Sequence, residues 1–202
     1  LFFFYYKFED AEFKNLYLEC KKKKIIFMST LFIVHLVNEL SKFLPLLKIA
    51  SADITNVPLL RAIGSQKKPV LLSTGASSLD EIKFALKVLD LPKKQVCIMH
   101  CVLNYPTKIE NANLNFISTL KNKFPHHIIG YSDHVSPDKE LTSVESAWYL
   151  GAQIIEKHFT FDKTKKGNDH YHSADKKDFL NFYERMKKIK ILKGNFSKNL
   201  KK

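Results

Sequence analysis

Cysteine is scarce in this chain, and long hydrophobic runs are absent from it. The 202 residues include three cysteines, Cys20, Cys97 and Cys101, and none of them has CxxC spacing. An odd number without that spacing disfavours a disulfide framework and indicates reduced thiols. No apolar run approaches the ~20 residues that a membrane span needs. The opening LFFFYY is too short for the apolar region of a signal peptide. We therefore expect a cytoplasmic protein without a membrane partner.

The motifs that identify nucleotide-binding and nucleic-acid-binding proteins are also missing. No GxGxxG or Walker sequence follows any predicted strand, which disfavours a nucleotide-binding doubly wound fold. The chain has 33 Lys and Arg against 20 Asp and Glu, a net charge of +13. No zinc finger or RNP-type aromatic pattern accompanies this charge. A nucleic-acid partner would rest on charge alone, and we do not expect one, because the same excess suits anionic small substrates.

The overall composition is that of an ordinary globular protein. Hydrophobic residues make up 45% of the chain and charged residues 26%, and the length suits one large domain with a sizeable core. We expect residues 1–202 to form a single domain, with 1–7 as an extension and 194–202 as a frayed tail. Because the sequence begins with Leu1 instead of Met, we expect an internal fragment or a truncated gene model.

Short apolar segments alternate with amphipathic segments along the chain. The pattern predicts strands at 25–29, 46–51, 69–74, 96–101, 127–132 and 153–159. It predicts helices at 8–22, 34–43, 56–66, 78–89, 111–123, 140–150 and 174–192. Continuous apolar strands that alternate with helices indicate a parallel sheet buried on both faces.

Polar residues stand at the C-terminal end of every predicted strand. They are Ser29 and Thr30, Lys48 to Ser51, Ser73 and Thr74, His100 and Cys101, Ser132 to His134, and Glu156 to His158. This placement is typical of a (β/α) barrel, in which functional side chains gather at the C-terminal ends of the strands. Six strands cannot close the usual barrel of eight. We therefore expect an α/β fold of the TIM-barrel type that is incomplete by two strands.

Two histidines each follow the apolar run of a predicted strand within a residue or two, on consecutive strands. His134 and His158 are 24 positions apart, about the length of one strand–helix–strand unit. Parallel pairing would bring both imidazoles to one edge of the sheet, where they could share a metal ion. The carboxylates of Asp133 and Glu156 could orient them. The alternative is that each histidine is a hydrogen-bonded core residue.

The remaining histidines give weaker signals. We interpret four of them as surface or loop residues and two as structural residues. The first group is His126, His127, His170 and His172, and the second is His35 and His100.

Serines at three strand ends stand near one lysine. Ser51, Ser73 and Ser132 follow three different strands, and Lys48 lies inside the apolar segment before Ser51. A buried ammonium needs a partner, and hydroxyl donors that converge with it could hold a phosphate group. The alternative is that each serine only caps the following helix.

Eight segments, in the same order along the chain, carry a resemblance to a known family. They are FMSTLF at 27–32, LKIAS at 47–51, PVLLSTGAS at 69–77, HCVLNYPT at 100–107, NLNFISTLKNKFP at 113–125, IGYSDH at 129–134, LGAQIIEKHFTFDK at 150–163 and GNDHYHS at 167–173. Over roughly residues 8 to 192 the chain resembles the sialic acid synthases, N-acetylneuraminate synthase and its legionaminate and pseudaminate relatives.

The resemblance implies a (β/α)8 barrel and a carbohydrate-biosynthetic transferase. Such an enzyme condenses phosphoenolpyruvate with an N-acetylated amino sugar similar to N-acetylmannosamine, and forms a nonulosonic acid and phosphate. In the mechanism that the resemblance implies, a metal polarises the sugar aldehyde and C3 of phosphoenolpyruvate attacks it. Water then captures the oxocarbenium carbon, and phosphate leaves by C–O cleavage.

The resemblance also implies roles for individual residues. His134 and His158 match the two protein ligands of a divalent ion, manganese or magnesium, and together with Lys48 they are the expected catalytic residues. The residues that match the phosphoenolpyruvate site are Lys48, Ser51, Ser73 and Ser132, with Thr30 near the carboxylate. The residues expected to contact the acceptor sugar are Asn104, Tyr105 and Asp169.

The chain departs from the family pattern in three ways. The first two strands of the barrel are missing, and with them a catalytic glutamate and a lysine that binds phosphoenolpyruvate. The C-terminal antifreeze-like domain, which reaches a partner subunit's site with an arginine, is also absent. We expect the full-length form to be a homodimer. Leu103 stands where many members have Asn, and the adjacent Asn104 could substitute for it.

Two other interpretations compete with a synthase. The chain could be a non-catalytic remnant or fragment that acts at most as a binding module, because an open barrel exposes strand edges and apolar surface. A different metal-dependent aldolase-type barrel that uses phosphoenolpyruvate would not explain GYSDH and IEKHF together.

Overall fold

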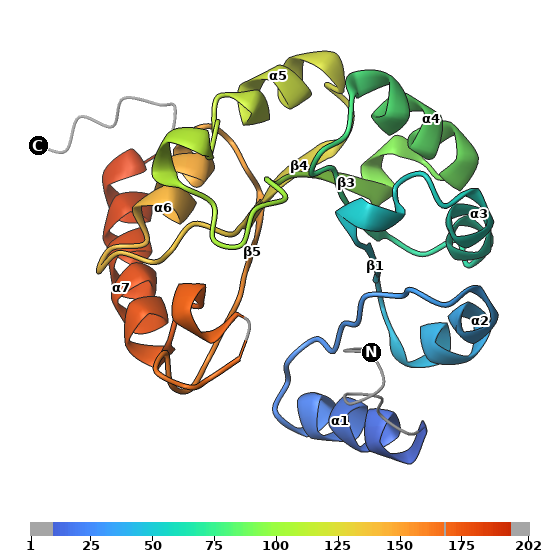
Figure 1. The fold of residues 1–202 in the computed structure, drawn as a ribbon, viewed down its shortest axis with the longest axis horizontal. Helices are drawn as coiled ribbons and strands as arrows, with labels where there is room; N and C mark the ends of the chain where they lie inside the picture. Colours follow the sequence, from blue (N-terminus) through green and yellow to red (C-terminus); the bar gives the residue numbers. More distant parts are fainter. Residues whose placement is uncertain (1–9, 168, 195–202) are drawn as a thin grey trace, which may run out of the picture.

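The computed structural model describes residues 10–167 and 169–194 (Figure 1). The extension predicted at 1–7 lies outside the described residues, and so does the predicted tail apart from Gly194. None of the described helices is both long and apolar enough to cross a lipid bilayer.

Five parallel strands form one sheet in the order of the sequence. They are β1 (Leu47–Ile49), β2 (Val70–Ser73), β3 (Val96–His100), β4 (Ile128–Asp133) and β5 (Ile154–Lys157). The sheet curls into an arc with β1 and β5 at its two ends (Figure 1). This half-barrel confirms the prediction of an incomplete α/β barrel of the TIM type.

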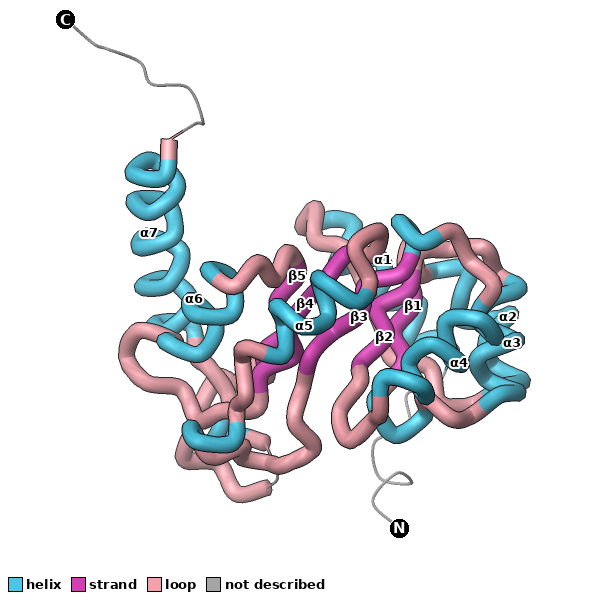
Figure 2. Tube along the Cα trace, turned by 90° about the horizontal axis from the view of Figure 1, so that it is seen from above, coloured by secondary structure: helices cyan, strands magenta, loops and turns pink. Residues whose placement is uncertain are grey.

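Helices connect the strands and lie along the convex side of the sheet. The α-helices are α1 (Asp10–Lys22), α2 (Val37–Leu40), α3 (Val57–Ser65), α4 (Leu79–Leu89), α5 (Phe116–Lys123), α6 (Thr142–Tyr149) and α7 (Lys176–Lys193). Figure 1 shows α3, α4, α5 and α6 outside the arc of strands. Seen from above, α7 extends away from the sheet beyond α6 (Figure 2).

Alternate residues of each strand point to opposite faces of the sheet. On the convex face Leu47, Ile49, Leu72 and Ile98 are fully buried in the main hydrophobic core under the helices. On the concave face a smaller apolar cluster contains Leu71, Cys97 and Met99. The same alternation places Lys48 and Ser73 on the concave face, because each is the neighbour of a convex-face residue in its own strand.

Gly64 allows α3 and α4 to approach closely. A Cβ atom at this position would lie 2.2 Å from the carbonyl oxygen of Leu89. That oxygen belongs to the backbone and cannot rotate away, so the helix contact requires glycine.

The segment predicted as a strand at 25–29 is not a strand. It runs beside β1 without regular pairing, and only Thr30 forms an isolated parallel bridge, to Lys48. Ile25 and Ile26 are 60% and 67% exposed. An apolar run becomes a strand only where a neighbouring backbone offers a hydrogen-bonded ladder. Residues 25–29 form no such ladder with the described residues, and the single bridge lies just after them, at Thr30. The sheet therefore has five strands where six were predicted.

Two predicted helices are shorter than their apolar patterns suggest. The segment 34–43 divides into a 3₁₀ turn (Val34–Leu36), α2 and a second 3₁₀ turn (Ser41–Phe43). Lys68 donates to the carbonyl oxygens of Ser41 and Leu44, which holds this end of the segment. The helix predicted from residue 111 starts at Phe116, because Asn113 has φ +44° and cannot continue a right-handed helix.

Candidate active site

The two histidines singled out in the sequence lie side by side at the carboxyl ends of neighbouring strands. His134 follows β4 and His158 follows β5, and these strands pair in parallel with Asp133 opposite Lys157. The centroids of the two imidazole rings are 5.4 Å apart. Parallel pairing thus brings both rings to one edge of the sheet, as the spacing predicted.

The surroundings of His134 fix which ring nitrogen could bind an ion. The His134 side chain is buried, and its Nδ1 lies 2.8 Å from the carbonyl oxygen of Val102. A metal-binding histidine usually donates its other ring N–H to such an oxygen, which sets the tautomer and the orientation of the ring. This contact leaves Nε2 as the nitrogen that can bind an ion.

Loss of solvation favours the neutral form of both imidazoles, which is the form that metals bind. Loss of solvation lowers the pKa of His134 below its ordinary value, against the opposing effect of the Val102 carbonyl. Loss of solvation likewise lowers the pKa of His158, and the nearby Asp169 carboxylate opposes that change. A neutral imidazole has a free lone pair on one nitrogen. The lowered pKa values and the contact of His134 with Val102 therefore both favour rings that can bind a metal ion.

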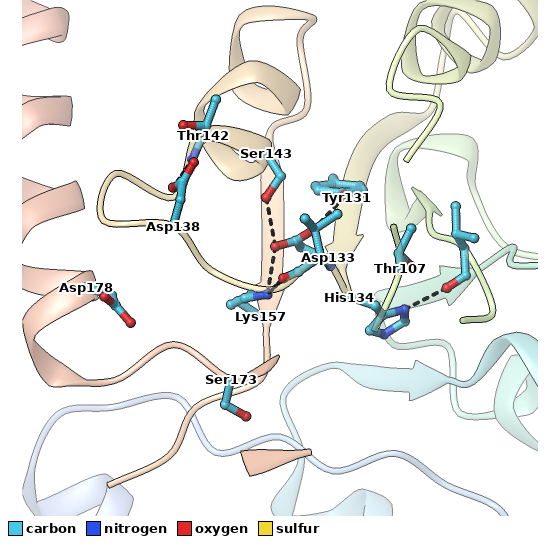
Figure 3. A network of polar contacts seen from close by, with 12 residues as sticks. Thr107, Tyr131, Asp133, His134, Asp138, Thr142, Ser143, Lys157, Ser173 and Asp178 are labelled. Carbon is cyan, nitrogen blue, oxygen red and sulfur yellow. Dashed lines mark hydrogen bonds and ion pairs between the residues drawn. The ribbon is translucent and has the colours of Figure 1, made fainter. Parts of the chain in front are cut away.

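The carboxylate of Asp133 does not orient His134, contrary to expectation. It forms a fully buried ion pair with Lys157, with 2.9 Å between Nζ and Oδ2. The hydroxyl groups of Tyr131 and Ser143 also donate to it, at 2.7 and 3.0 Å (Figure 3). Asp133 is adjacent to His134 in the chain and therefore points to the opposite face of the sheet. It ties β4, β5 and α6 together beneath the histidines.

Lys48 occupies the concave face on the other side of the site. Its side chain is buried, and Nζ donates to Ser73 Oγ at 2.8 Å. Glu156 was expected to orient His158, but its carboxylate lies 3.6 Å from Lys48 Nζ. Ser132 is buried at the same strand ends, and Ser51 Oγ packs against Gly75. The structure therefore brings the Lys48 ammonium together with the Ser73 hydroxyl and the Glu156 carboxylate, and a phosphate site at these strand ends stays a prediction.

The residues predicted to contact the sugar are only partly brought together. The Tyr105 ring centroid is 4.1 Å from that of His134, and Asp169 Oδ2 is 3.9 Å from His158 Nδ1. Asn104 is exposed, and its side chain has no hydrogen bond to either histidine within the described part of the chain. Thr30 stands beside Lys48 through the backbone bridge between them.

His172 is the residue that the sequence interpretation missed. It was predicted to be a surface or loop residue, but its side chain is fully buried in a short 3₁₀ turn (His170–His172). Its ring centroid is 5.0 Å from that of His158. The signal in the sequence was its position three residues after Asp169, a spacing that lets one turn direct both side chains to the same point. His100, by contrast, is structural, with Nε2 2.9 Å from the Ala112 carbonyl oxygen.

This arrangement offers two kinds of chemistry at one edge. Neutral imidazoles and a carboxylate are a suitable donor set for a divalent ion. The buried ammonium of Lys48 with the hydroxyl of Ser73 can bind an anion such as a phosphate or a carboxylate. A site that holds a metal ion next to an anionic substrate is typical of enzymes that activate a carbonyl group.

Comparison with known proteins assigns the family. The NeuB family profile matches residues 2–198. The N,N'-diacetyllegionaminic acid synthase of Campylobacter jejuni is 36% identical over 195 residues, which cover 94% of this chain and 57% of the relative. An uncharacterised protein of Methanocaldococcus jannaschii is 40% identical over 191 residues, 94% of this chain and 56% of its own.

A solved structure agrees with the sequence matches. The N-acetylneuraminic acid synthetase of Leptospira borgpetersenii serovar Hardjo-bovis, in complex with citrate, has a TM-score of 0.86 and 36% identity. The match covers 96% of this chain and 67% of that one. The chain spans about half the length of the curated relatives that it matches. Because the family profile spans nearly all of its residues, the chain belongs to the NeuB family.

Proposed function

We propose that this chain carries part of a site that condenses phosphoenolpyruvate with an N-acetylated amino sugar to give a nonulosonic acid and phosphate. The observation that carries the proposal is the pairing of two neutral imidazoles, 5.4 Å apart, at the strand ends that also present the buried Lys48. Relatives in the family are named as synthases of legionaminic and sialic acids, which supports the same class of product.

Lys48 and its neighbours would bind the anionic substrate. The ammonium lies on the concave face with Ser73 Oγ at 2.8 Å, and the side chain is 7% exposed. In such a poorly solvated place a charged hydrogen bond to phosphate or carboxylate is stronger than in water. The role of these residues is to hold phosphoenolpyruvate with its C3 atom toward the sugar.

His134 and His158 would hold a divalent ion. Their lowered pKa values favour the neutral ring, in which one nitrogen has a free lone pair, and the Val102 carbonyl fixes the tautomer of His134. When bound, such an ion supplies Lewis acidity toward the carbonyl oxygen of the sugar. Manganese and magnesium are the expected ions.

Tyr105 and Asp169 would position the acceptor sugar. Both lie against the histidine pair, and both are about half exposed, so a sugar can reach them. Their hydroxyl and carboxylate groups are hydrogen-bonding partners for sugar hydroxyl and amide groups. The sugar would therefore sit between the open side of the site and the imidazoles.

Phosphate release provides the test. We expect the full-length form to release phosphate only when both phosphoenolpyruvate and an N-acylated hexosamine are present. EDTA should abolish the release, and added Mn²⁺ should restore it. His134→Ala should behave like EDTA treatment, whereas His35→Ala, which changes an exposed histidine, should not alter the rate. Turnover that is insensitive to EDTA would overturn the assignment of His134 and His158.

A binding module is the second candidate. The observation that favours it is the open arc, in which β1 and β5 do not meet within the described residues. Calorimetric binding of phosphoenolpyruvate that depends on Lys48, without phosphate release for any amino sugar of a panel, would support this alternative against the synthase.

A further inference from the structure

His172 is a buried histidine without a hydrogen-bond partner. Its side chain is 0% exposed, and within the described part of the chain neither ring nitrogen has a hydrogen bond. A neutral imidazole has one N–H donor and one lone pair. Leaving both unsatisfied in the interior is unfavourable, and such groups are rare in folded proteins. The ring nitrogens of His172 are therefore available to a ligand that the described residues do not supply.

Two other potential ligands surround the same point. His158, Asp169 and His172, here called the His–Asp–His cluster, offer ligand atoms that all lie within 4.8 Å of one another. Asp169 Oδ1 is 3.6 Å from His172 Nε2, and Asp169 Oδ2 is 3.9 Å from His158 Nδ1. Both separations are slightly longer than hydrogen bonds.

The backbone holds this cluster together. The loop after β5 returns so that the Ala174 amide donates to the His158 carbonyl oxygen at 2.8 Å. The Thr160 amide donates to the Ala174 carbonyl oxygen at 2.9 Å. His172 is two residues from Ala174, so these contacts fix its place beside His158.

We propose that His172 is a third imidazole ligand of the divalent ion, and that Asp169 completes the set with one carboxylate oxygen. This inference rests on the proposed function, which places the ion at His134 and His158. On a six-coordinate ion with bonds of about 2.0 to 2.1 Å, neighbouring ligand atoms lie about 3 Å apart, and four protein ligands leave two positions open for the sugar. His134 lies outside the His–Asp–His cluster, with its ring centroid 5.4 Å from that of His158. Binding of one ion by all three imidazoles would therefore draw His134 and the half-exposed Asp169 side chain toward the cluster, and the second oxygen of Asp169 would be left for the sugar.

A third imidazole changes which ions the site prefers. Oxygen-rich sites suit magnesium and manganese, whereas imidazole ligands suit zinc, iron, nickel and related ions. With three imidazoles and one carboxylate, the site should bind Co²⁺ or Zn²⁺ much more tightly than Mg²⁺. Removal of His172 should reduce that preference.

Cobalt provides a direct readout that does not depend on turnover. Co²⁺ would be titrated into wild type, His172→Phe and His172→Gln, with visible absorption and calorimetry to follow binding. Phe fills the buried space without a ligand atom, and Gln keeps a polar group without an imidazole. His127→Phe is the matched control, because His127 also has a buried ring nitrogen without a partner but lies at the start of β4, far along the strand from the site.

We expect both His172 variants to bind Co²⁺ at least about tenfold more weakly, the smallest effect typical of losing even a supporting partner of a metal ligand. The cobalt absorption band should change in the same variants, and His127→Phe should match wild type. Without metal, His172→Phe should unfold at a temperature no lower than wild type, since it removes an unsatisfied buried group.

The outcomes separate this inference from the proposed function. If the His172 variants bind Co²⁺ like wild type while His134→Ala does not bind it, His172 is not a ligand and the two-histidine site stands. If wild type binds no divalent ion, both the inference and the metal part of the proposed function fail. The third ligand would be established if both His172 variants bind Co²⁺ more weakly than wild type, the His127→Phe control does not, and the His172 variants keep the near-ultraviolet circular dichroism of the native protein.

Discussion

At the scale of single residues, the site histidines are supported by their neighbours in sequence. Asp133 precedes His134 and Lys157 precedes His158, and the two preceding residues pair with each other on the opposite face. Their side chains are 0% and 1% exposed. The pair therefore fixes the relative position of the two strand ends from which the imidazoles project.

Removing one partner of this pair should strongly destabilise the protein. We expect Lys157→Met to lower the free energy of unfolding by about 3–5 kcal/mol, because Asp133 would remain as an unpaired buried charge. Replacing both partners, Asp133→Leu with Lys157→Met, should recover part of the loss. Urea unfolding followed by circular dichroism measures both. Lys83→Met, which breaks an exposed pair with Asp80, is the control and should have no measurable effect. If Lys157→Met lowered the free energy of unfolding no more than Lys83→Met does, the Asp133–Lys157 ion pair would not be what holds β4 and β5 together.

The buried cysteines should be unreactive in the native protein. Burial raises the pKa of the Cys97 thiol to about 12 and also raises the pKa of Cys101. The thiolate is the reactive form, so near neutral pH iodoacetamide should label Cys20 and spare the other two. After denaturation all three should be labelled, as mass spectrometry can count. Rapid labelling of Cys97 in the native state would contradict its burial.

The same pKa shift gives a pH dependence of stability. The folded pKa of Cys97 is raised above the ordinary value of 9.0. The stabilisation that the protonated Cys97 thiol gives the folded protein is therefore fully present below pH 9.0, and it is lost as the pH rises toward about 12. The loss is about 1.4 kcal/mol for each pH unit in that window. The stability difference between wild type and Cys97→Ala should accordingly become smaller above pH 9.

Sequence reasoning found some site residues and missed others for a physical reason. His134, His158 and Lys48 follow or lie in apolar strands, and parallel pairing dictates that strand ends meet. His172 lies in a loop, and only the path of the backbone after β5 shows that the ring turns inward. Asp133 and Glu156 were assigned to the wrong partners for two different reasons. Asp133 is one position from His134 and faces the other side of the sheet, where it pairs with Lys157. Glu156 is on the side of the histidines but lies against Lys48.

At the scale of elements, the contact between α3 and α4 depends on one glycine. We expect Gly64→Ala to destabilise the protein by about 1–3 kcal/mol, because the added Cβ would meet the Leu89 carbonyl oxygen at 2.2 Å. Helix propensity alone predicts the opposite sign, since Ala is favoured over Gly within a helix. Thermal unfolding decides between the two effects. Ser65→Ala, on the exposed side of the same helix, is the control. A more stable Gly64→Ala variant would refute the close contact.

The elements themselves were largely predictable where two signals coincided. The helix predicted at 78–89 begins with Ser78, and its hydroxyl accepts from the Glu81 amide in a capping box at the start of α4. The apolar runs of β1 to β5 match the predicted strands within a few residues. Failures occurred where an apolar run was the only signal. The segment 25–29 lacks a backbone partner, and the positive φ of Asn113 delays α5.

At the scale of the whole molecule, the alternation of strands and helices was sufficient to predict the fold class. Each connection crosses over the same convex face, so consecutive strands become neighbours and the sheet curls in one direction. The number of strands could not be obtained in the same way. It depends on which segments find a partner, and that is a property of the assembled sheet.

The division of β4 and β5 into a structural face and a site face has a consequence for how such a chain can evolve. His134 and Asp133 are one position apart, yet His134 belongs to the candidate site and Asp133 to the buried ion pair with Lys157 on the opposite face. A single residue inserted or deleted within β4 would exchange the two faces. It would turn the imidazole toward the helices and leave Lys157 facing an uncharged position. Substitutions within β4 can therefore have small or large effects on stability and on the site. Insertions and deletions are tolerated only in the loops, where they do not change which face each strand residue occupies.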